Sequence, residues 1–439
     1  MPRRALARLA DVDRPMNHFE LRAGVVHCED VPLPLIAREV GTPVFVYSTA
    51  TMQRHARVLN QALASLDDPL IAFAVKANPN AGVLATLAAE GLGADVVSGG
   101  EYQRARAAGM RADKIVFSGV GKTAAEMMLA LEGGVYQFNL ESLPEAEMLS
   151  EVALSVGRTA QVSFRINPDV AAGSHAKIST GSAQTKFGIL LADARAAFAR
   201  ARELPGLCVQ GVAVHIGSQL TSLDPLRAAF ERLGGLISEL RDDGHRILTA
   251  DLGGGLGIPY DPALPFPPSP DEYGALVTSV AGGWGTRLIF EPGRLIVGNA
   301  GVLLTEVIRV KEGVVHPFVI VDAAMNDLMR PSLYDAWHEI EAVAPKGKPM
   351  IADIVGPVCE TGDIFARARS IDDVESGDYM IIRTAGAYAA TMGSTYNSRP
   401  LAAEVLVSGS EWAVVRERQQ VETLIQNDII PAWLRGRSA

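Results

Sequence analysis

Lys76 is the residue whose type and position first suggest catalysis, because it directly follows the apolar run Phe-Ala-Val. An amine at the end of a buried strand is partly desolvated, so we expect the pKa of Lys76 to be lowered and the amine to be nucleophilic. A Schiff base with an aldehyde cofactor requires such an amine. Taken alone, Lys76 could also be a lysine that extends from a strand end into solvent.

Two other segments could contact a cofactor. The turn Asp251–Gly257 is rich in glycine and follows an apolar run, so its backbone N–H groups could approach a phosphate closely. Its spacing does not match the G-x-G-x-x-G dinucleotide motif. His215 ends another apolar run, where its flat ring could stack on a cofactor or form hydrogen bonds in the core. Gly121-Lys122-Thr123 resembles the end of a P-loop, but Val116 occupies the position of the required glycine, which argues against an NTPase.

Glu291 and Arg294 stand in the sequence Phe-Glu-Pro-Gly-Arg. A carboxylate beside a pyridine nitrogen would keep that nitrogen protonated, and the ring could then withdraw electrons from a bound carbanion. Arg294 could bind a phosphate or a carboxylate. A surface ion pair at a turn is the alternative for these two residues. His338-Glu339 lacks the second histidine of H-E-x-x-H, which argues against a zinc hydrolase, and we expect no metal site.

The C-terminal part of the chain carries three more candidates. Arg330 and Tyr334 bring a guanidinium and a phenol close together in sequence, and Cys359 and Glu360 place a thiol beside a carboxylate. A lone cysteine is usually buried and inert, which is the alternative for Cys359. Tyr388, in Ala-Gly-Ala-Tyr-Ala-Ala, would by itself be a packing residue.

The elements that must position these side chains follow a regular alternation. Eight short apolar runs between residues 71 and 291 alternate with stretches of helical period, which predicts a (β/α)8 barrel. The runs are Ile71–Lys76, Ala94–Val97, Ile115–Phe117, Val135–Phe138, Gln161–Ile166, Val209–His215, Ile247–Leu252 and Arg287–Glu291. The active site of such a barrel lies at the carboxyl ends of its strands. Polar residues at these ends should therefore converge, namely Lys76, Asp95, Ser118, Asn139, Arg165, His215, Gly253–Gly257 and Glu291.

After Pro292 the pattern changes to strand-like runs separated by turn residues, which predicts a β-sandwich or β-barrel. These runs are Val302–Val310, Phe318–Asp322, Met350–Val355, Tyr379–Arg383, Glu404–Val407 and Trp412–Val415. Phe19–Tyr47 is rich in β-branched residues and could add strands to this part. We therefore expect a disordered leader at 1–15, a cofactor-binding barrel at 48–291, and a β domain formed by 16–47 with 292–439.

Composition excludes several classes of protein. The chain has 439 residues, 48% of them hydrophobic and 21% charged, with a formal net charge of −10. This balance is typical of a globular protein, and neither a membrane span nor a basic patch for nucleic acid is expected. Three separated cysteines predict neither a disulfide framework nor a metal motif and fit a cytoplasmic location. The first 15 residues lack the apolar core of a secretory signal.

The motifs taken together resemble a known family. Phe-Ala-Val-Lys-Ala-Asn, Val-His-Ile-Gly-Ser-Gln, Asp-Leu-Gly-Gly-Gly-Leu-Gly, Glu-Pro-Gly-Arg and Gly-Pro-Val-Cys-Glu-Thr-Gly-Asp occur in one order along the chain. Their order and spacing resemble those of the pyridoxal 5′-phosphate-dependent decarboxylases of fold type III, which have an alanine-racemase-like architecture. Within that group the sequence is most similar to the diaminopimelate decarboxylases. The resemblance runs from about Phe19 to the C-terminus.

The resemblance implies a role for each candidate. Lys76 would form the Schiff base, His215 would stack on the cofactor ring, and Glu291 would pair with the pyridinium. Further cofactor contacts would be Ser218, Gly253, Gly254, Gly255, Tyr388 and a supporting pair of Asp95 with Arg165. Substrate contacts would be Arg294, Arg330, Tyr334, Glu360 and Tyr388. Cys359 would be a candidate proton donor, reaching with Glu360 into the site of a neighbouring subunit, so a homodimer is implied.

The implied reaction is the decarboxylation of meso-2,6-diaminopimelate to L-lysine and carbon dioxide, the last step of lysine synthesis. A substrate with carboxylates at both ends fits several arginines in one site. Two alternatives stay open: a decarboxylase of the same fold acting on ornithine, lysine or arginine, and a catalytically silent regulatory homologue. Ornithine decarboxylases typically carry Asp where this chain has Glu360, and a silent homologue would not need an intact Lys76, Glu291 and Cys359.

Overall fold

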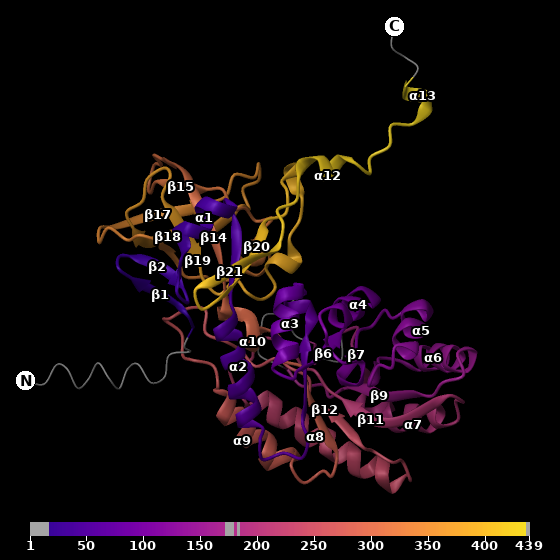
Figure 1. Cartoon of the computed structure of the whole chain (residues 1–439). Coiled ribbons are helices and arrows are strands. Elements are labelled where there is room, and N and C mark those ends of the chain that lie inside the picture. The colour runs from indigo at the N-terminus through magenta and orange to yellow at the C-terminus, as the bar shows by residue number, and fades with distance from the viewer. Residues whose placement is uncertain (1–16, 172–179, 182–184, 436–439) are drawn as a thin grey trace, which may run out of the picture. The chain divides into compact units, whose positions relative to one another are not determined.

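The computed structural model describes residues 17–171, 180–181 and 185–435, so the leader predicted at 1–15 lies outside the described residues. The chain forms two compact units (Figure 1). Among the described residues, the first contains 17–19, 48–301 and 386–391, and the second contains 20–47, 302–385 and 392–435. Within the described residues, no helix is long and apolar enough to cross a membrane.

The first unit is built around a closed barrel of eight parallel strands, as the alternation predicted. Neighbouring strands of the barrel pair in chain order, and the last strand, β13, pairs with the first, β5, to close the ring. The strands are β5 (Leu70–Ala74), β6 (Gly93–Val96), β7 (Ile115–Phe117), β8 (Gln137–Leu140), β9 (Ala160–Asn167), β11 (Leu207–Ala213), β12 (Thr249–Asp251) and β13 (Arg287–Phe290). β5, β6, β7 and β8 are buried along their whole length, as expected for strands covered on both faces. A short strand, β10 (Ile189–Leu190), adds to β9.

Helices alternate with the barrel strands. Several begin at a side-chain cap: Ser98, Thr123, Ser142 and Ser269 each accept a hydrogen bond from a backbone N–H of the first turn, which satisfies a donor that the helix cannot pair. The helices are α2 (Thr49–Ala62), α3 (Ala81–Ala89), α4 (Gly99–Ala107), α5 (Ala124–Glu132), α6 (Leu143–Ser155), α7 (Ala194–Arg202), α8 (Asp224–Asp242), α9 (Pro270–Ala281) and α10 (Arg294–Val297).

The second unit is rich in sheet. Seven strands of its largest sheet follow the order β18-β17-β15-β14-β4-β20-β21, and β19 pairs with β14 and β16. Their bounds are β4 (Val44–Ser48), β14 (Gly301–Lys311), β15 (Phe318–Val321), β16 (Ile340–Ala342), β17 (Pro349–Val355), β18 (Ile364–Asp372), β19 (Tyr379–Ile382), β20 (Ala403–Ser408) and β21 (Glu411–Arg416). β4 comes from the N-terminal segment, so a barrel followed by a β-rich part that includes this segment is confirmed.

Smaller elements complete the second unit. The three-stranded sheet consists of β1 (Phe19–Arg22), β2 (Val25–Cys28) and β3 (Val31–Pro32), and α1 (Leu33–Val40) follows it. Three short helices are α11 (Arg330–Tyr334), α12 (Val421–Ile425) and α13 (Ala432–Arg435). The sequence patterns did not indicate β16, β18 or α11.

Candidate active site

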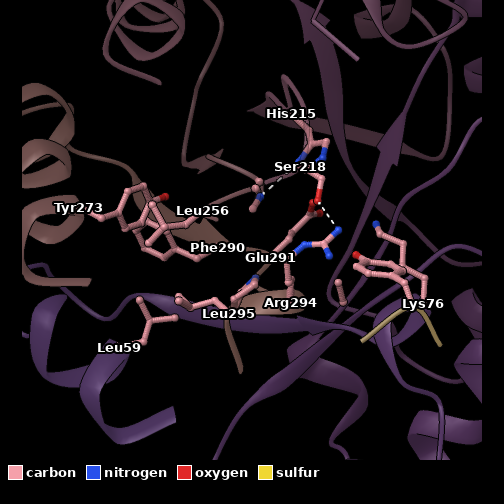
Figure 2. Close-up of a pocket in the computed structure, with 17 residues that line it drawn as sticks. Leu59, Lys76, His215, Ser218, Leu256, Tyr273, Phe290, Glu291, Arg294 and Leu295 are labelled. Atoms are coloured by element: carbon pink, nitrogen blue, oxygen red, sulfur yellow. Dashed lines mark hydrogen bonds between the residues drawn. The ribbon is translucent and has the colours of Figure 1, made fainter. Parts of the chain in front are cut away.

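Two cavities open at the carboxyl ends of the barrel strands, and Lys76, His215 and Glu291 line both of them. The larger cavity has a volume of about 390 Å³. Figure 2 shows the other cavity, where these three side chains, from the ends of three strands, lie around Arg294 at the start of α10 (Arg294–Val297). Of the strand-end residues expected to converge, those that line the cavities are Lys76, Ser118, Asn139, Arg165, His215, Gly253–Gly255 and Glu291.

Lys76 lies in the short turn Val75–Ala77 that follows β5. Its amine donates to Oδ2 of Asp95 at 2.9 Å, and the Asp95 side chain is fully buried. Burial alone would lower the pKa of Lys76, but the charges of Asp95, Glu291 and Tyr388 outweigh burial and raise that pKa above its ordinary value. The expectation of a lowered pKa was therefore wrong. These charges favour the protonated amine, and Oδ2 of Asp95 accepts its hydrogen bond.

His215 is held as a neutral ring. The backbone N–H of Gly254 donates to its Nδ1 at 3.2 Å, so this nitrogen carries a lone pair rather than a proton. Burial and the positive charges of Arg165 and Lys76 keep the pKa of His215 well below its usual range. A neutral, flat ring at the cavity wall is suited to stacking.

The glycine turn after β12 packs tightly against the end of β13. A Cβ atom on Gly254 would lie 2.1 Å from the carbonyl oxygen of Glu291, so only glycine fits at this position. The N–H of Gly253 donates to Oδ1 of Asp251, and that of Gly254 is used by His215. Gly255 is thus the member of the three whose N–H has no acceptor among the described residues, and it lines the cavity.

Arg294 lies at the start of α10 and is 7% exposed. Its Nη2 donates to the hydroxyl of Ser218 at 3.2 Å and its Nη1 to the hydroxyl of Tyr260 at 2.6 Å. The guanidinium also lies over the ring of Tyr388, 4.9 Å from its centroid. The alternative of a surface ion pair between Glu291 and Arg294 is wrong, because both residues are buried. Tyr260 was missed, since nothing in the spacing of its neighbours marks it.

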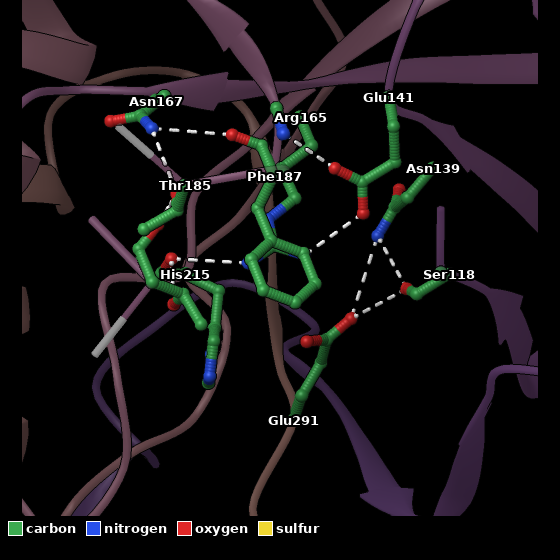
Figure 3. Close-up of polar contacts among 12 residues, drawn as sticks. Ser118, Asn139, Glu141, Arg165, Asn167, Thr185, Phe187, His215 and Glu291 are labelled. Atoms are coloured by element: carbon green, nitrogen blue, oxygen red, sulfur yellow. Dashed lines mark hydrogen bonds and ion pairs between the residues drawn. The ribbon is translucent and has the colours of Figure 1, made fainter. Parts of the chain in front are cut away.

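Glu291 follows β13 and belongs to a group of buried carboxyls. Burial and the neighbouring charges of Asp251 and Asp95 raise the pKa of Glu291 well above its ordinary value, against the opposing effect of Lys76. The hydroxyl of Ser118 donates to Oε1 of Glu291 at 3.1 Å. Figure 3 shows this contact beside those of Asn139 and Glu141.

Arg165 has a different partner from the one expected. Its Nη1 donates to Oε1 of Glu141 at 2.9 Å, while Asp95 pairs with Lys76. The guanidinium also lies over the ring of Phe187, 4.7 Å from the centroid (Figure 3). The expected pair of Asp95 with Arg165 is therefore wrong. Glu141 was not predicted as a site residue, because nothing in the sequence around it indicates that it pairs with Arg165.

The remaining candidates belong to the second unit. Arg330, at the start of α11, is buried, and its Nη1 donates to Nε2 of His338 at 2.7 Å. The ring of His338 contacts the carbonyl oxygen of Arg383 through Nδ1 at 2.8 Å. Tyr334 ends the same short helix. His338, set aside as an incomplete zinc motif, is thus a partner of a predicted substrate residue.

Cys359 and Glu360 lie on an exposed turn of the second unit. Asp363 shapes this turn by accepting the N–H groups of Met325 and Val358, the latter at 2.7 Å. The N–H of Cys359 donates to Oδ1 of Asn397 at 3.0 Å. The alternative of a buried, inert cysteine is wrong for Cys359, since this thiol is presented on the surface.

Comparisons with known proteins show the family of this chain. The pyridoxal-binding domain of the pyridoxal-dependent decarboxylases matches residues 49–298. The diaminopimelate decarboxylases of Zymomonas mobilis and Neisseria meningitidis are 56% and 49% identical, over 95% and 92% of this chain and 100% and 98% of theirs. The chain belongs to the diaminopimelate decarboxylase family. A solved diaminopimelate decarboxylase from M. jannaschii, in complex with L-lysine, has a TM-score of 0.91 at 35% identity, over 96% of this chain and 99% of that one.

Membership of the diaminopimelate decarboxylases makes this protein a pyridoxal-phosphate-dependent decarboxylase, as the motifs predicted. The barrel residues fit that cofactor. Asp95, Asp251 and Glu291 bury three carboxyls beside one lysine, an excess of acid that a protonated ring nitrogen would offset. Oδ1 of Asp95 is buried and has no hydrogen-bond partner among the described residues.

Proposed function

We propose that this protein decarboxylates meso-2,6-diaminopimelate at its D-centre and releases L-lysine and carbon dioxide, the last step of lysine synthesis. The observation that carries this function is the 56% identity to a diaminopimelate decarboxylase over that protein's whole length, in a chain whose barrel brings Lys76, His215 and Glu291 to one place. The cofactor-binding barrel would be residues 48–291, and residues 16–47 with 292–439 the second domain.

The barrel residues have two kinds of role: some would bind the cofactor, and others would donate or accept protons. When bound, pyridoxal phosphate supplies an electron-withdrawing ring that accepts the electrons left by departing carbon dioxide. Lys76 would supply the amine that holds the cofactor, and Asp95, which accepts a hydrogen bond from that amine, would be placed to take its proton. His215 offers a neutral ring face, and Glu291 offers a carboxylate to the ring nitrogen.

Ser218, Gly253–Gly255 and Tyr388 would hold the phosphate of the cofactor. Arg294 was expected to contact the substrate, but its hydrogen bond to the Ser218 hydroxyl favours the phosphate instead. With Arg294 at the phosphate and Arg165 paired to Glu141, the distal carboxylate of a two-ended substrate depends on Arg330. Arg330 and Tyr334 share one short helix, so a single element would present both groups to the substrate.

The exposed turn with Cys359 and Glu360 supports a homodimer with shared sites. A thiol and a carboxylate on a surface turn can enter the active site of a second copy, where Glu360 would bind the distal amine of the substrate. Cys359 would then donate a proton to the carbon that has lost its carboxyl group. We place the enzyme in the cytoplasm, where its three cysteines stay reduced.

The substrate is tested by incubating the purified protein and pyridoxal phosphate with meso-diaminopimelate, L-ornithine or L-lysine and measuring carbon dioxide release. We expect release from diaminopimelate alone. Release only from ornithine or lysine would keep the barrel chemistry and overturn the substrate. A Lys76→Ala variant should remain folded by circular dichroism and lose turnover, and substantial residual release from it would contradict the role of Lys76.

A further inference from the structure

A chain of hydrogen bonds crosses the interior of the barrel below Glu291. The hydroxyl of Thr249 donates to the side-chain carbonyl of Gln137 at 2.7 Å, and the Gln137 amide donates to the side-chain carbonyl of Asn139 at 2.8 Å. The Asn139 amide in turn donates to Oδ2 of Asp251 at 2.8 Å. All four side chains are buried, so none of these bonds competes with bulk water.

The same Asn139 amide faces two more acceptors. Its nitrogen is 3.4 Å from Oε1 of Glu291 and 3.2 Å from the oxygen of Ser118, whose hydroxyl donates to Glu291 (Figure 3). The Asn139 amide therefore contacts both members of a carboxyl pair, Asp251 at 2.8 Å and Glu291 at 3.4 Å, and these two carboxyls also hydrogen-bond to each other. Two like charges buried together are unfavourable unless donors stabilise them.

This network has only one favourable direction. Because two carboxyls lie at one end, Asn139 must present its NH2 group to them and its carbonyl to Gln137. Gln137 must then donate with its own NH2 group, and its carbonyl accepts the Thr249 hydroxyl. Turning the Asn139 amide would place its carbonyl against both carboxyls and leave buried groups unpaired, which is costly. Gln137 and Thr249 thus determine that the NH2 group of Asn139, and not its carbonyl oxygen, points toward Glu291.

The charges around Glu291 make such a donor necessary. Asp251 faces it from β12, Asp95 from β6 and Lys76 from the turn after β5. The two carboxyls and burial favour the protonated, neutral form of Glu291, and Lys76 alone opposes them among these groups. A neutral carboxyl cannot offset the charge of a protonated ring nitrogen, so donors to the ionised form would act together with that nitrogen's own charge to favour the carboxylate of Glu291.

We propose that Asn139, oriented by Gln137 and Thr249, is a positioning residue that stabilises the ionised form of the Asp251–Glu291 pair and so keeps a carboxylate of Glu291 available to the ring nitrogen of pyridoxal phosphate. Asn139 acts through Glu291 and does not need to touch the cofactor. The inference rests on the proposed function, because it assigns Glu291 to the ring nitrogen. Removing the amide should leave the proton on the Asp251–Glu291 pair and weaken the protonation of the cofactor ring.

The test compares Asn139→Leu with Asn167→Leu, a matched control. Asn167 ends the neighbouring strand β9 and is equally buried, but its amide bonds Thr185 and Phe187 instead of a carboxyl. Two quantities are measured: the dissociation constant of pyridoxal phosphate, and the 15N resonance of cofactor labelled at the ring nitrogen across a pH series. Neither depends on turnover, and thermal unfolding confirms that each variant is folded.

We expect a protonated ring nitrogen in the wild type and in Asn167→Leu. In Asn139→Leu the ring nitrogen should lose its proton at lower pH, and cofactor binding should weaken about tenfold. A ring-nitrogen signal in Asn139→Leu that matches the wild type would overturn the inference. If Asn139→Leu does not fold, Ser118→Ala decides by the same readouts, since it removes a hydroxyl that both donates to Glu291 and accepts from Asn139. Failure of the wild type to bind the cofactor would instead refute the proposed function.

Discussion

Lys76 and Asp95 form an ion pair of 2.9 Å at the carboxyl ends of adjacent barrel strands, with the carboxyl fully buried. This ion pair favours the protonated amine of Lys76, whereas the cofactor aldehyde reacts with the unprotonated amine. The enzyme therefore holds Lys76 in place through charge, and capture of the cofactor must include the transfer of that proton. Burial is the largest single influence on the pKa of Lys76 and lowers it, but the charges of Asp95, Glu291 and Tyr388 together outweigh burial and raise that pKa.

Asp95→Asn should change the pH at which the cofactor is captured. Loss of the negative charge lowers the pKa of Lys76, so more of the amine is unprotonated at neutral pH, and capture of added pyridoxal phosphate by the cofactor-free protein should be about tenfold faster. The rise of the capture rate with pH should shift to lower pH, as followed by visible absorbance. Asp113→Asn, which alters an exposed pair with Arg111, is the control. A pH profile unchanged from wild type would rule out Asp95 as the group that raises the pKa.

Cys359→Ala should slow turnover about a hundredfold and leave the dissociation constant of pyridoxal phosphate nearly unchanged, because a proton donor acts in the chemical step. The measurement is kcat for diaminopimelate together with a cofactor titration. Cys208→Ala is the matched control, since Cys208 is a partly buried cysteine of the barrel strand β11. Equal rates for both variants would exclude the Cys359 thiol as the essential acid.

His338→Leu should raise KM for diaminopimelate about tenfold with a smaller change in kcat, because Arg330 loses the acceptor that orients its guanidinium. His338→Asn, which keeps a side-chain acceptor, should recover part of the affinity. His27→Leu is the control, because the one hydrogen bond of the His27 ring among the described residues is to the backbone carbonyl oxygen of Val25 at 3.1 Å. An unchanged KM in His338→Leu would separate His338 from substrate binding.

The strands of the barrel could be predicted from the sequence, but the contacts between the side chains of its site could not. The eight strands were confirmed because buried parallel strands read as short apolar runs between helical stretches. Short or polar elements such as α11 and β18 carry no such period and were missed. The sequence also did not reveal the ion-pair partners of two charged residues. Arg165 pairs with Glu141, and Lys76 pairs with Asp95, in each case from the end of a neighbouring strand. Such pairing depends on the register between strands rather than on distance in sequence.

Functional class was predictable because it depends on residue types in a fixed order. The pyridoxal-phosphate-dependent decarboxylase, its fold and its cofactor are confirmed. The direction of the pKa shift of Lys76 was wrong, since burial was the only influence visible in the run Phe-Ala-Val-Lys. The hydrogen bonds of Asn139 could not be foreseen either, because they join residues of β8 and β12 only once the barrel has closed.

The position of β4 also determines when the sheet of the second unit can be completed during synthesis. This strand ends at Ser48, yet it lies between β14 and β20, and β20 begins only at Ala403. During translation both edges of β4 therefore stay without their partner strands until the entire barrel sequence has been synthesised. The barrel strands follow one another in the chain and can pair as they emerge. Nascent chains that stop before β20 should therefore expose the edge of β4 to chaperones even when their barrel has already formed.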